Sequence, residues 1–162
     1  MPAIYLGLGS NIEPQKNLDL GLKELGKRFG RLEKSSVYRS KAYGFDGDAF
    51  LNMVIGLETG LPPGEIYDQT EEIQRMAGRD RFARGYSSRA LDIDLLLYDD
   101  LVVDDPPIRL PRPDVLRFSF VLGPLAEIAP KLLHPETHQS YQDHWDKFDT
   151  GRHPITRESV IL

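Results

Sequence analysis

Residues 91–98 read Leu91-Asp92-Ile93-Asp94-Leu95-Leu96-Leu97-Tyr98, and this run is typical of a β-strand. Alternate side chains of a strand point to the same side, so Asp92 and Asp94 are expected to lie together on one side. The apolar side chains expected on the opposite side are Leu91, Ile93, Leu95 and Leu97.

The chain before this strand predicts three more strands and two helices. Hydrophobic alternation over residues 3–9 and β-rich composition over 50–59 indicate strands, and the polar stretch 31–40 reads as an exposed or edge strand. Apolar residues at helical spacing predict helices over 14–29 and 62–78. The order strand-helix-strand-strand-helix-strand is the α+β, ferredoxin-like split βαβ arrangement. It predicts a four-stranded, mostly antiparallel sheet with both helices on one face.

The remainder of the chain carries weaker signals. Residues 101–103 read as a short β-like segment, 106–113 as a proline-rich loop, and 120–129 as a helix that Pro130 ends. We expect residues 1–148 to form a single domain and residues 149–162 to be an irregular C-terminal tail. The free face of the sheet is left for a ligand or for these added elements.

Composition narrows the class of protein. Apolar residues make up 40% of the chain and charged residues 28%, the net charge is −5, and there is no cysteine. This balance indicates a globular protein without disulfides or a thiolate metal site, and the acidic charge argues against generic nucleic-acid binding. No signal peptide or membrane span is recognised, so a cytoplasmic protein without membrane or nucleic-acid partners is expected.

Basic residues lie close in the sequence to the acidic pair in residues 91–98. Two carboxylates on one strand face suit Mg²⁺, and four arginines precede them within fourteen residues. Arginine forks match phosphate oxygens, so the combination suggests a nucleotide site. An ion-pair network without a ligand remains the alternative. The four arginines are Arg79, Arg81, Arg84 and Arg89.

Two other features could contribute to a site. Phe50 and Asn52 share a strand face beside the long loop 41–49, where a ring and an amide could bind a planar heterocycle, although an aromatic residue in a strand usually belongs to the core. His134 and His138 are four residues apart, but Pro135 between them makes a zinc site a minor alternative. An RNA-binding module of the same fold is a further alternative, which the acidic charge and the missing RNA-binding motif disfavour.

With these residues identified, the sequence resembles the 6-hydroxymethyl-7,8-dihydropterin pyrophosphokinases of folate biosynthesis over residues 3–148. The most specific part is an R-x-L-D-x-D-hydrophobic segment with an upstream G-R-x-R. The matching segments are Leu8-Gly9-Ser10-Asn11, Val37-Tyr38-Arg39-Ser40, Phe50-Leu51-Asn52, Gly78-Arg79-Asp80-Arg81, residues 89–97 and residues 124–130.

The resemblance implies an ATP-dependent transferase that moves pyrophosphate from ATP to the pterin hydroxymethyl oxygen and releases AMP. It implies two magnesium ions on Asp92 and Asp94, with Arg79 and Arg89 also acting in catalysis. The residues implied for ATP are Gln74, Arg79, Arg81, Arg84, Arg89 and Arg112. The residues implied for the pterin are Ser40, Tyr43, Phe50, Asn52 and Phe120. We expect ATP and the pterin as the partners of a monomer.

Several positions depart from the family pattern. Arg112 stands where histidine is usual, Phe118 where an arginine is usual, and Lys41 where proline is common. The loop before the aspartates has Ser87 and Ser88 in place of glycine and proline. These departures leave open a paralogue that acts on a related pterin, or a non-catalytic pterin- or nucleotide-binding protein of the same fold.

Overall fold

The structure, a computed structural model, describes residues 1–78, 90–160 and 162. The strands are β1 (Ala3–Ser10), β2 (Glu33–Lys34), β3 (Val37–Ser40), β4 (Phe50–Glu58), β5 (Asp92–Tyr98), β6 (Val103–Asp105), β7 (Ile108–Leu110) and β8 (Thr156–Glu158). The helices are α1 (Pro14–Phe29), α2 (Pro63–Met76), α3 (Asp114–Arg117), α4 (Ser119–Ile128) and α5 (Tyr141–Lys147).

The main sheet has the predicted topology. Its strand order is β5-β1-β4-β3-β8, β2 also pairs with β4, and every pairing is antiparallel. The hairpin strand β4 lies between β1 and β3, which is the split βαβ arrangement. The prediction of an α+β, ferredoxin-like fold is confirmed, but the described sheet has six strands and not four. The strand predicted over 31–40 is divided into β2 and β3, which both pair with β4, and β8 is added beside β3.

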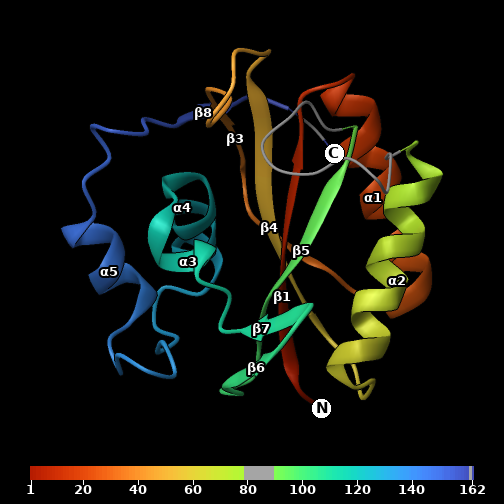
Figure 1. Cartoon of the computed structure of the whole chain (residues 1–162), viewed down its shortest axis with the longest axis vertical. Helices are drawn as coiled ribbons and strands as arrows, with labels where there is room; N and C mark the ends of the chain where they lie inside the picture. The colour runs from red at the N-terminus through yellow and green to blue at the C-terminus, as the bar shows by residue number, and fades with distance from the viewer. Residues whose placement is uncertain (79–89, 161) are drawn as a thin grey trace.

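Helices cover both faces of the sheet. In Figure 1, α1 and α2 lie against one face, while α3 and α4 lie on the other, with α5 outside them. The first face buries the apolar side of α1, where Leu18 and Leu25 are fully buried against Ile4 and Leu6 of β1. The second face carries a separate apolar cluster, built on Leu122 and other residues of α4. The two helices predicted for one face are therefore there, and the added C-terminal helices occupy the other.

A bulge in β5 changes which way its later residues point. Tyr5 of β1 is opposite Leu97, whereas the next residue, Leu6, is opposite Leu95, so Leu96 is an extra residue in β5. As a result Leu97 packs with the cluster around α4 and not with Ile93. The prediction that Leu97 shares a side with Ile93 and Leu95 was wrong, because strict alternation does not survive a bulge.

Two other expectations need correction. Residues 106–113 are not wholly loop, since β7 pairs there with β6 in a hairpin. Residues 149–162 are not wholly irregular, since β8 pairs with β3, which therefore does not form the outer edge of the sheet at that point. Both strands have only three residues, too few for their alternation to be distinguished from loop sequence.

In the described parts of the chain, no helix has both the length and the apolarity that a bilayer crossing requires.

Candidate active site

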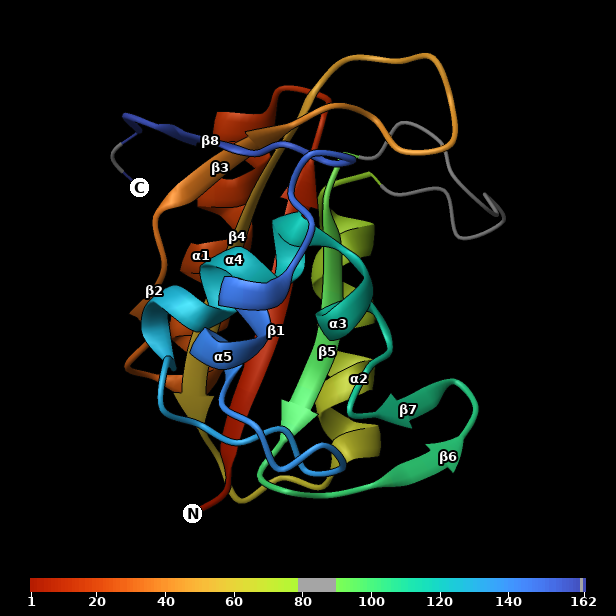
Figure 2. The same ribbon diagram turned by 90° about the vertical axis from the view of Figure 1, so that its left-hand side faces the viewer.

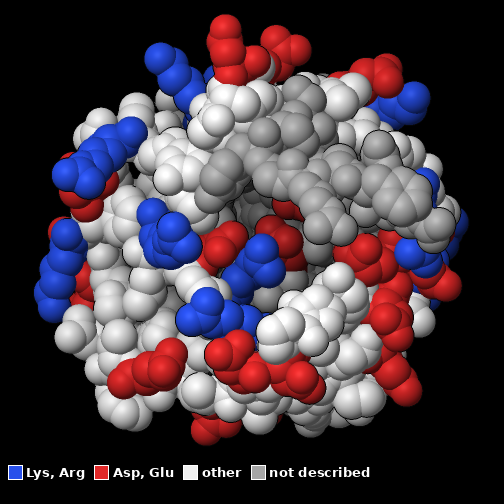
Figure 3. Space-filling model, in the orientation of Figure 1, with Lys and Arg blue, Asp and Glu red and all other residues white. Residues whose placement is uncertain are grey.

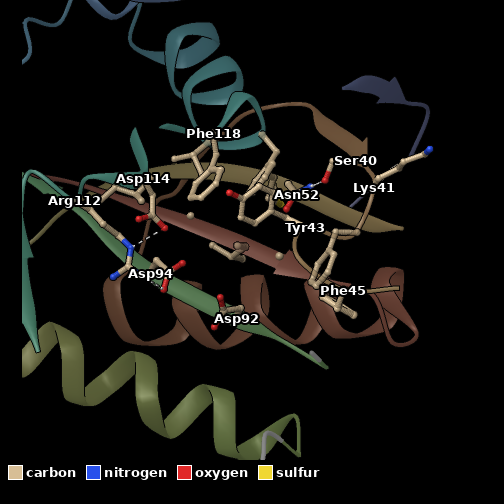
Figure 4. Close-up of a pocket in the computed structure, with 18 residues that line it drawn as sticks. Ser40, Lys41, Tyr43, Phe45, Asn52, Asp92, Asp94, Arg112, Asp114 and Phe118 are labelled. Atoms are coloured by element: carbon tan, nitrogen blue, oxygen red, sulfur yellow. Dashed lines mark hydrogen bonds and ion pairs between the residues drawn. The ribbon is translucent and has the colours of Figure 1, made fainter. Parts of the chain in front are cut away.

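A pocket of about 320 Å³ lies on the sheet face that α3 and α4 cover. Figure 3 shows acidic and basic side chains gathered around a hollow on the surface, and Figure 4 shows the side chains inside the pocket. Its polar and charged lining residues are Ser40, Lys41, Asn52, Asp92, Asp94, Arg112 and Asp114. Its apolar and aromatic lining residues are Gly7, Leu8, Gly9, Tyr43, Phe45, Phe50, Met53, Leu96, Phe118, Phe120 and Val121.

Two glycines of β1 form the floor of this pocket. In the strand register Gly9 lies between Asp92 of β5 and Asn52 of β4, and Gly7 lies beside Asp94. A Cβ atom on Gly9 would be only 3.2 Å from Asn52 Oδ1, closer than ordinary van der Waals contact. The missing side chains therefore leave open space between the carboxylates and the amide.

One side of the pocket, which we call the charged wall, consists of Asp92, Asp94, Arg112 and Asp114. Arg112 Nη2 is 3.6 Å from Asp94 Oδ1, and Arg112 Nε is 3.2 Å from Asp114 Oδ2. Burial of the Arg112 guanidinium lowers its pKa, but the charges of Asp94 and Asp114 outweigh this effect and raise the pKa above its ordinary value. Arg112 is therefore a permanent cation beside the acidic pair.

The backbone between the two aspartates is supported from α2. The Gln74 side chain is fully buried, and its Oε1 accepts a hydrogen bond of 3.1 Å from the backbone N–H of Ile93. Gln74 Nε2 donates to the Thr70 carbonyl at 3.0 Å. Gln74 therefore joins α2 to β5 and does not line this pocket, and its expected contact with ATP stays a prediction.

Opposite the charged wall, β3 and β4 contribute a pair of polar side chains. Asn52 Nδ2 donates to Ser40 Oγ at 2.8 Å, and both residues are buried. This bond fixes the amide so that Oδ1 lies on the side of Gly9. The following loop is tied to the end of β1, where Asn11 Nδ2 donates to the Asp48 carbonyl at 3.1 Å.

Aromatic rings close the pocket on the α3–α4 side. The rings of Phe118 and Phe120 stack at 5.1 Å, and Tyr43 meets the edge of Phe118 at 5.0 Å. We call Tyr43, Phe118 and Phe120 the aromatic wall. Phe45 and Phe50 make a second, T-shaped contact at 6.3 Å. The structure thus brings together all five residues expected to bind the pterin with Asp92, Asp94 and Arg112.

Some functional candidates were missed in the sequence, and others lie outside the described residues. The pocket is also lined by Phe45, Asp114 and Phe118. The sequence signals that could have indicated them were the position of Phe45 within the loop 41–49 and the closeness of the other two to Arg112 in the chain. The four expected phosphate-binding arginines lie outside the described residues. They are Arg79, Arg81, Arg84 and Arg89, with Ser87 and Ser88 between them.

The acidic pair fits a hard cation by its donors. Mg²⁺ commonly takes one or two carboxylates from the protein and completes its shell with water and substrate phosphates, so a third protein ligand is not required. In residues 1–78, 90–160 and 162, no group of three or more histidine or acidic side chains is placed to hold a metal. The histidines in these ranges, for which a zinc site was the minor alternative, therefore belong to no such group. His134 Nδ1 instead accepts hydrogen bonds from the backbone N–H groups of Glu136 and Thr137.

Comparison with curated proteins finds close relatives of nearly equal length. The chain is 38% identical over 138 residues to 2-amino-4-hydroxy-6-hydroxymethyldihydropteridine pyrophosphokinase of Aquifex aeolicus, covering 83% of this chain and 85% of the relative. It is 38% identical over 142 residues to the protein of the same name from Porphyromonas gingivalis, covering 84% and 96%. It is also 32% identical to the folic acid synthesis protein fol1 of Pneumocystis carinii, over 90% of this chain and 20% of that protein.

Comparison with solved structures supports the fold. The crystal structure of Plasmodium falciparum HPPK-DHPS matches with a TM-score of 0.72 at 12% identity, over 90% of this chain and 44% of the solved chain. At this identity the match bears on the fold alone. The sequence profile of the 7,8-dihydro-6-hydroxymethylpterin-pyrophosphokinase family matches residues 5–130. Together with relatives at 38% identity over most of both chains, this match shows that the chain belongs to the 7,8-dihydro-6-hydroxymethylpterin-pyrophosphokinase (HPPK) family.

Proposed function

We propose that this chain transfers pyrophosphate from ATP to the hydroxymethyl group of 6-hydroxymethyl-7,8-dihydropterin, releasing AMP, in folate biosynthesis. Family membership and the names of the curated relatives support the reaction. The observation in the structure that best supports it is a pocket in which a glycine floor separates two carboxylates from a buried amide and an aromatic wall. Such a pocket suits a polyphosphate on one side and a flat heterocycle on the other.

The polar pair and the rings are suited to the pterin. Asn52 has an amide oxygen on the pocket side of Gly9, and Ser40 is held beside it by a 2.8 Å hydrogen bond. A pterin ring carries both donors and acceptors along one edge, which an amide and a hydroxyl can match. Its flat faces can stack on aromatic side chains, for which Phe50 and the aromatic wall are the candidates.

The charged wall is suited to the ATP phosphates. Asp92 and Asp94 would hold magnesium, for which we propose two ions shared with the phosphate oxygens. When bound, the metal would neutralise charge on the phosphates. Arg112 is placed beside the same carboxylates and would add a further positive charge at the phosphates. Arg79, Arg81, Arg84 and Arg89 are proposed to bind the phosphates as well.

The proposed step is an in-line displacement at the β-phosphorus of ATP. A bond forms between the hydroxymethyl oxygen and the β-phosphorus, the bond from the β-phosphorus to the bridging α–β oxygen breaks, and AMP leaves. The hydroxyl proton passes to solvent, and no side chain is assigned as general base. The pocket's part is to align the two substrates across Gly9 and to place positive charge around the phosphates. No observation favours a different pterin or a non-catalytic role, and we propose that the protein acts as a monomer.

AMP release tests this function directly. Purified protein is incubated with ATP and Mg²⁺, with and without 6-hydroxymethyl-7,8-dihydropterin, and AMP is measured by chromatography. Steady AMP formation that requires the pterin is expected. Calorimetric binding of the pterin without AMP formation would instead favour a binding protein, and AMP release that ignores the pterin would indicate another acceptor.

A further inference from the structure

The segment after α5 passes beside the aromatic wall on its way to the sheet. Figure 2 shows the chain leaving α5, running past α4 and turning to join β3 as β8. Residue His153 lies in the middle of this path, and its ring centroid is 4.8 Å from that of Tyr43 and 5.9 Å from that of Phe120. Both partners line the pocket, whereas His153 itself stands behind them.

This segment is fixed at His153 itself and again at β8. Before β8, the Ser119 hydroxyl at the start of α4 donates a hydrogen bond to the His153 carbonyl. After it, β8 pairs with β3, and Arg39 Nε of β3 is 2.5 Å from Glu158 Oε1 of β8. The backbone of His153 is thus held in place by contacts that do not involve its ring.

Gly123 of α4 lets the segment approach closely. A Cβ atom at this position would lie 2.9 Å from Ile155 Cδ1 and 3.0 Å from an atom of the Trp145 ring. Ile155 therefore packs where a larger residue would push it away. The contact places residues 153–155 against α4, the helix whose first turn carries Phe120.

Tyr43 is the member of the aromatic wall with the least support from regular structure. It lies in the loop between β3 and β4, whereas Phe118 and Phe120 lie at the start of α4. Its ring meets the edge of Phe118 at 5.0 Å and lies 4.8 Å from the ring of His153, so His153 is a ring partner of this loop residue.

We propose that His153 is a positioning residue of the pterin pocket, which holds Tyr43 and Phe120 in place from behind the aromatic wall. The proposal rests on the proposed function, since it assigns the pterin to this wall. His153 is not a catalytic residue, because Tyr43 and Phe120 separate it from the pocket. Loss of its ring should weaken pterin binding roughly three- to tenfold, the size expected for an aromatic pair. Binding of ATP, which we place at the charged wall, should not change.

The test compares His153→Ala with His153→Phe and with Arg152→Ala, a neighbouring side chain that is 90% exposed. The pterin Kd is measured by fluorescence quenching, and KM for each substrate and kcat by AMP release. We expect His153→Ala to raise the pterin Kd and KM with kcat and the ATP KM unchanged, His153→Phe to restore binding, and Arg152→Ala to match the wild type. An unchanged pterin Kd in His153→Ala, or an equal rise in the KM of both substrates, would overturn the proposal.

A second measurement needs no ligand. Hydrogen exchange of the backbone amides in residues 41–49 should be faster in His153→Ala than in the wild type and in Arg152→Ala, because Tyr43 loses a partner. Unchanged exchange would contradict the positioning role. If the wild-type protein neither bound the pterin nor formed AMP, the proposed function would fail, whereas an active wild type with an unaffected His153→Ala variant would overturn this inference alone.

Discussion

The two walls of the pocket are built in different ways. In the charged wall, Asp92 and Asp94 are two residues apart on one strand, and their backbone is joined to α2 through Gln74. The aromatic wall combines Tyr43 from a loop with Phe118 and Phe120 from the start of α4, and His153 packs behind it. Local strand geometry places the first wall, whereas the second depends on segments more than a hundred residues apart in the chain.

This difference leads to different expectations for substitutions. A change in the charged wall should affect ATP binding or the chemical step, since it alters the charges around the phosphates. A change in the floor or in the aromatic wall should affect binding of the pterin and leave the chemical step intact. The predictions below test this division.

Asp94→Asn is expected to have the largest effect. It removes one of two carboxylates proposed to hold magnesium but keeps the size of the side chain. Turnover measured by AMP release should fall by about 10²- to 10³-fold, while circular dichroism shows a folded protein. Asp104→Asn, at an exposed position of β6, is the matched control and should keep full activity. Activity near the wild-type level in Asp94→Asn would refute the metal assignment.

Gly9→Val should have the next largest effect, because it fills the floor between the walls. A Cβ atom there is already 3.2 Å from Asn52 Oδ1, and the added methyl groups would occupy pocket space. The pterin Kd, measured by fluorescence, should rise roughly tenfold or more. Gly26→Ala on α1, where a Cβ atom meets no heavy atom within 4 Å, is the control and should leave binding unchanged. Equal pterin binding by Gly9→Val would mean that the pterin does not lie over this floor.

Arg112→Gln tests the charged wall with a smaller change. It removes the cation that is 3.6 Å from Asp94 and 3.2 Å from Asp114. Because the Arg112 side chain is partly exposed, we expect ATP binding to lose about 1 kcal/mol of free energy. This loss corresponds to a roughly fivefold higher KM for ATP. The pterin Kd should stay the same. Arg112→His, which restores the residue common in the family, should retain most of the ATP affinity, and a larger effect on the pterin than on ATP would contradict the division between the walls.

His134→Asn lies outside both walls and should have the smallest effect. Burial, together with the charge of nearby His144, lowers the pKa of His134, while Glu136 opposes and His138 adds to this shift. The folded state therefore favours neutral His134, so stability present above pH 6.5 is lost as the pH falls through the lowered pKa. The free energy of unfolding in urea is measured at pH 7 and at pH 5. Its decrease between these pH values should be smaller in His134→Asn than in the wild type, by less than about 1 kcal/mol. Binding of both substrates at pH 7 should not change, and an identical pH dependence would contradict the assignment.

Much of the fold follows from local sequence patterns. The alternation in β1 and β5 and the helical spacing in α1 and α2 were sufficient to predict the split βαβ order. The bulge at Leu96 was not predictable, because an extra residue in a strand has no signature in an apolar run. Strand β8 was not predictable either, because three polar residues form a strand only where an existing edge is available.

The candidate site divides in the same way. Asp92 and Asp94 could be identified from their spacing, and the family resemblance indicated all five pterin-side residues that line the pocket. The resemblance also assigned the Gln74 side chain to ATP, and this assignment stays a prediction. The structure turns that side chain toward Ile93. The support of Tyr43 by His153 is a tertiary contact between distant segments, which no local pattern indicates.

Strand β8 has a further consequence for the behaviour of the protein at high concentration. An uncovered β3 would present a row of unpaired backbone groups that another chain could join, which is a common route to aggregation. The strand that covers it is short, and its sequence Thr156-Arg157-Glu158 includes two charged side chains. A short, charged outer strand is a poor template for intermolecular pairing. The segment that we place behind the pocket should therefore also help to keep the protein from aggregating.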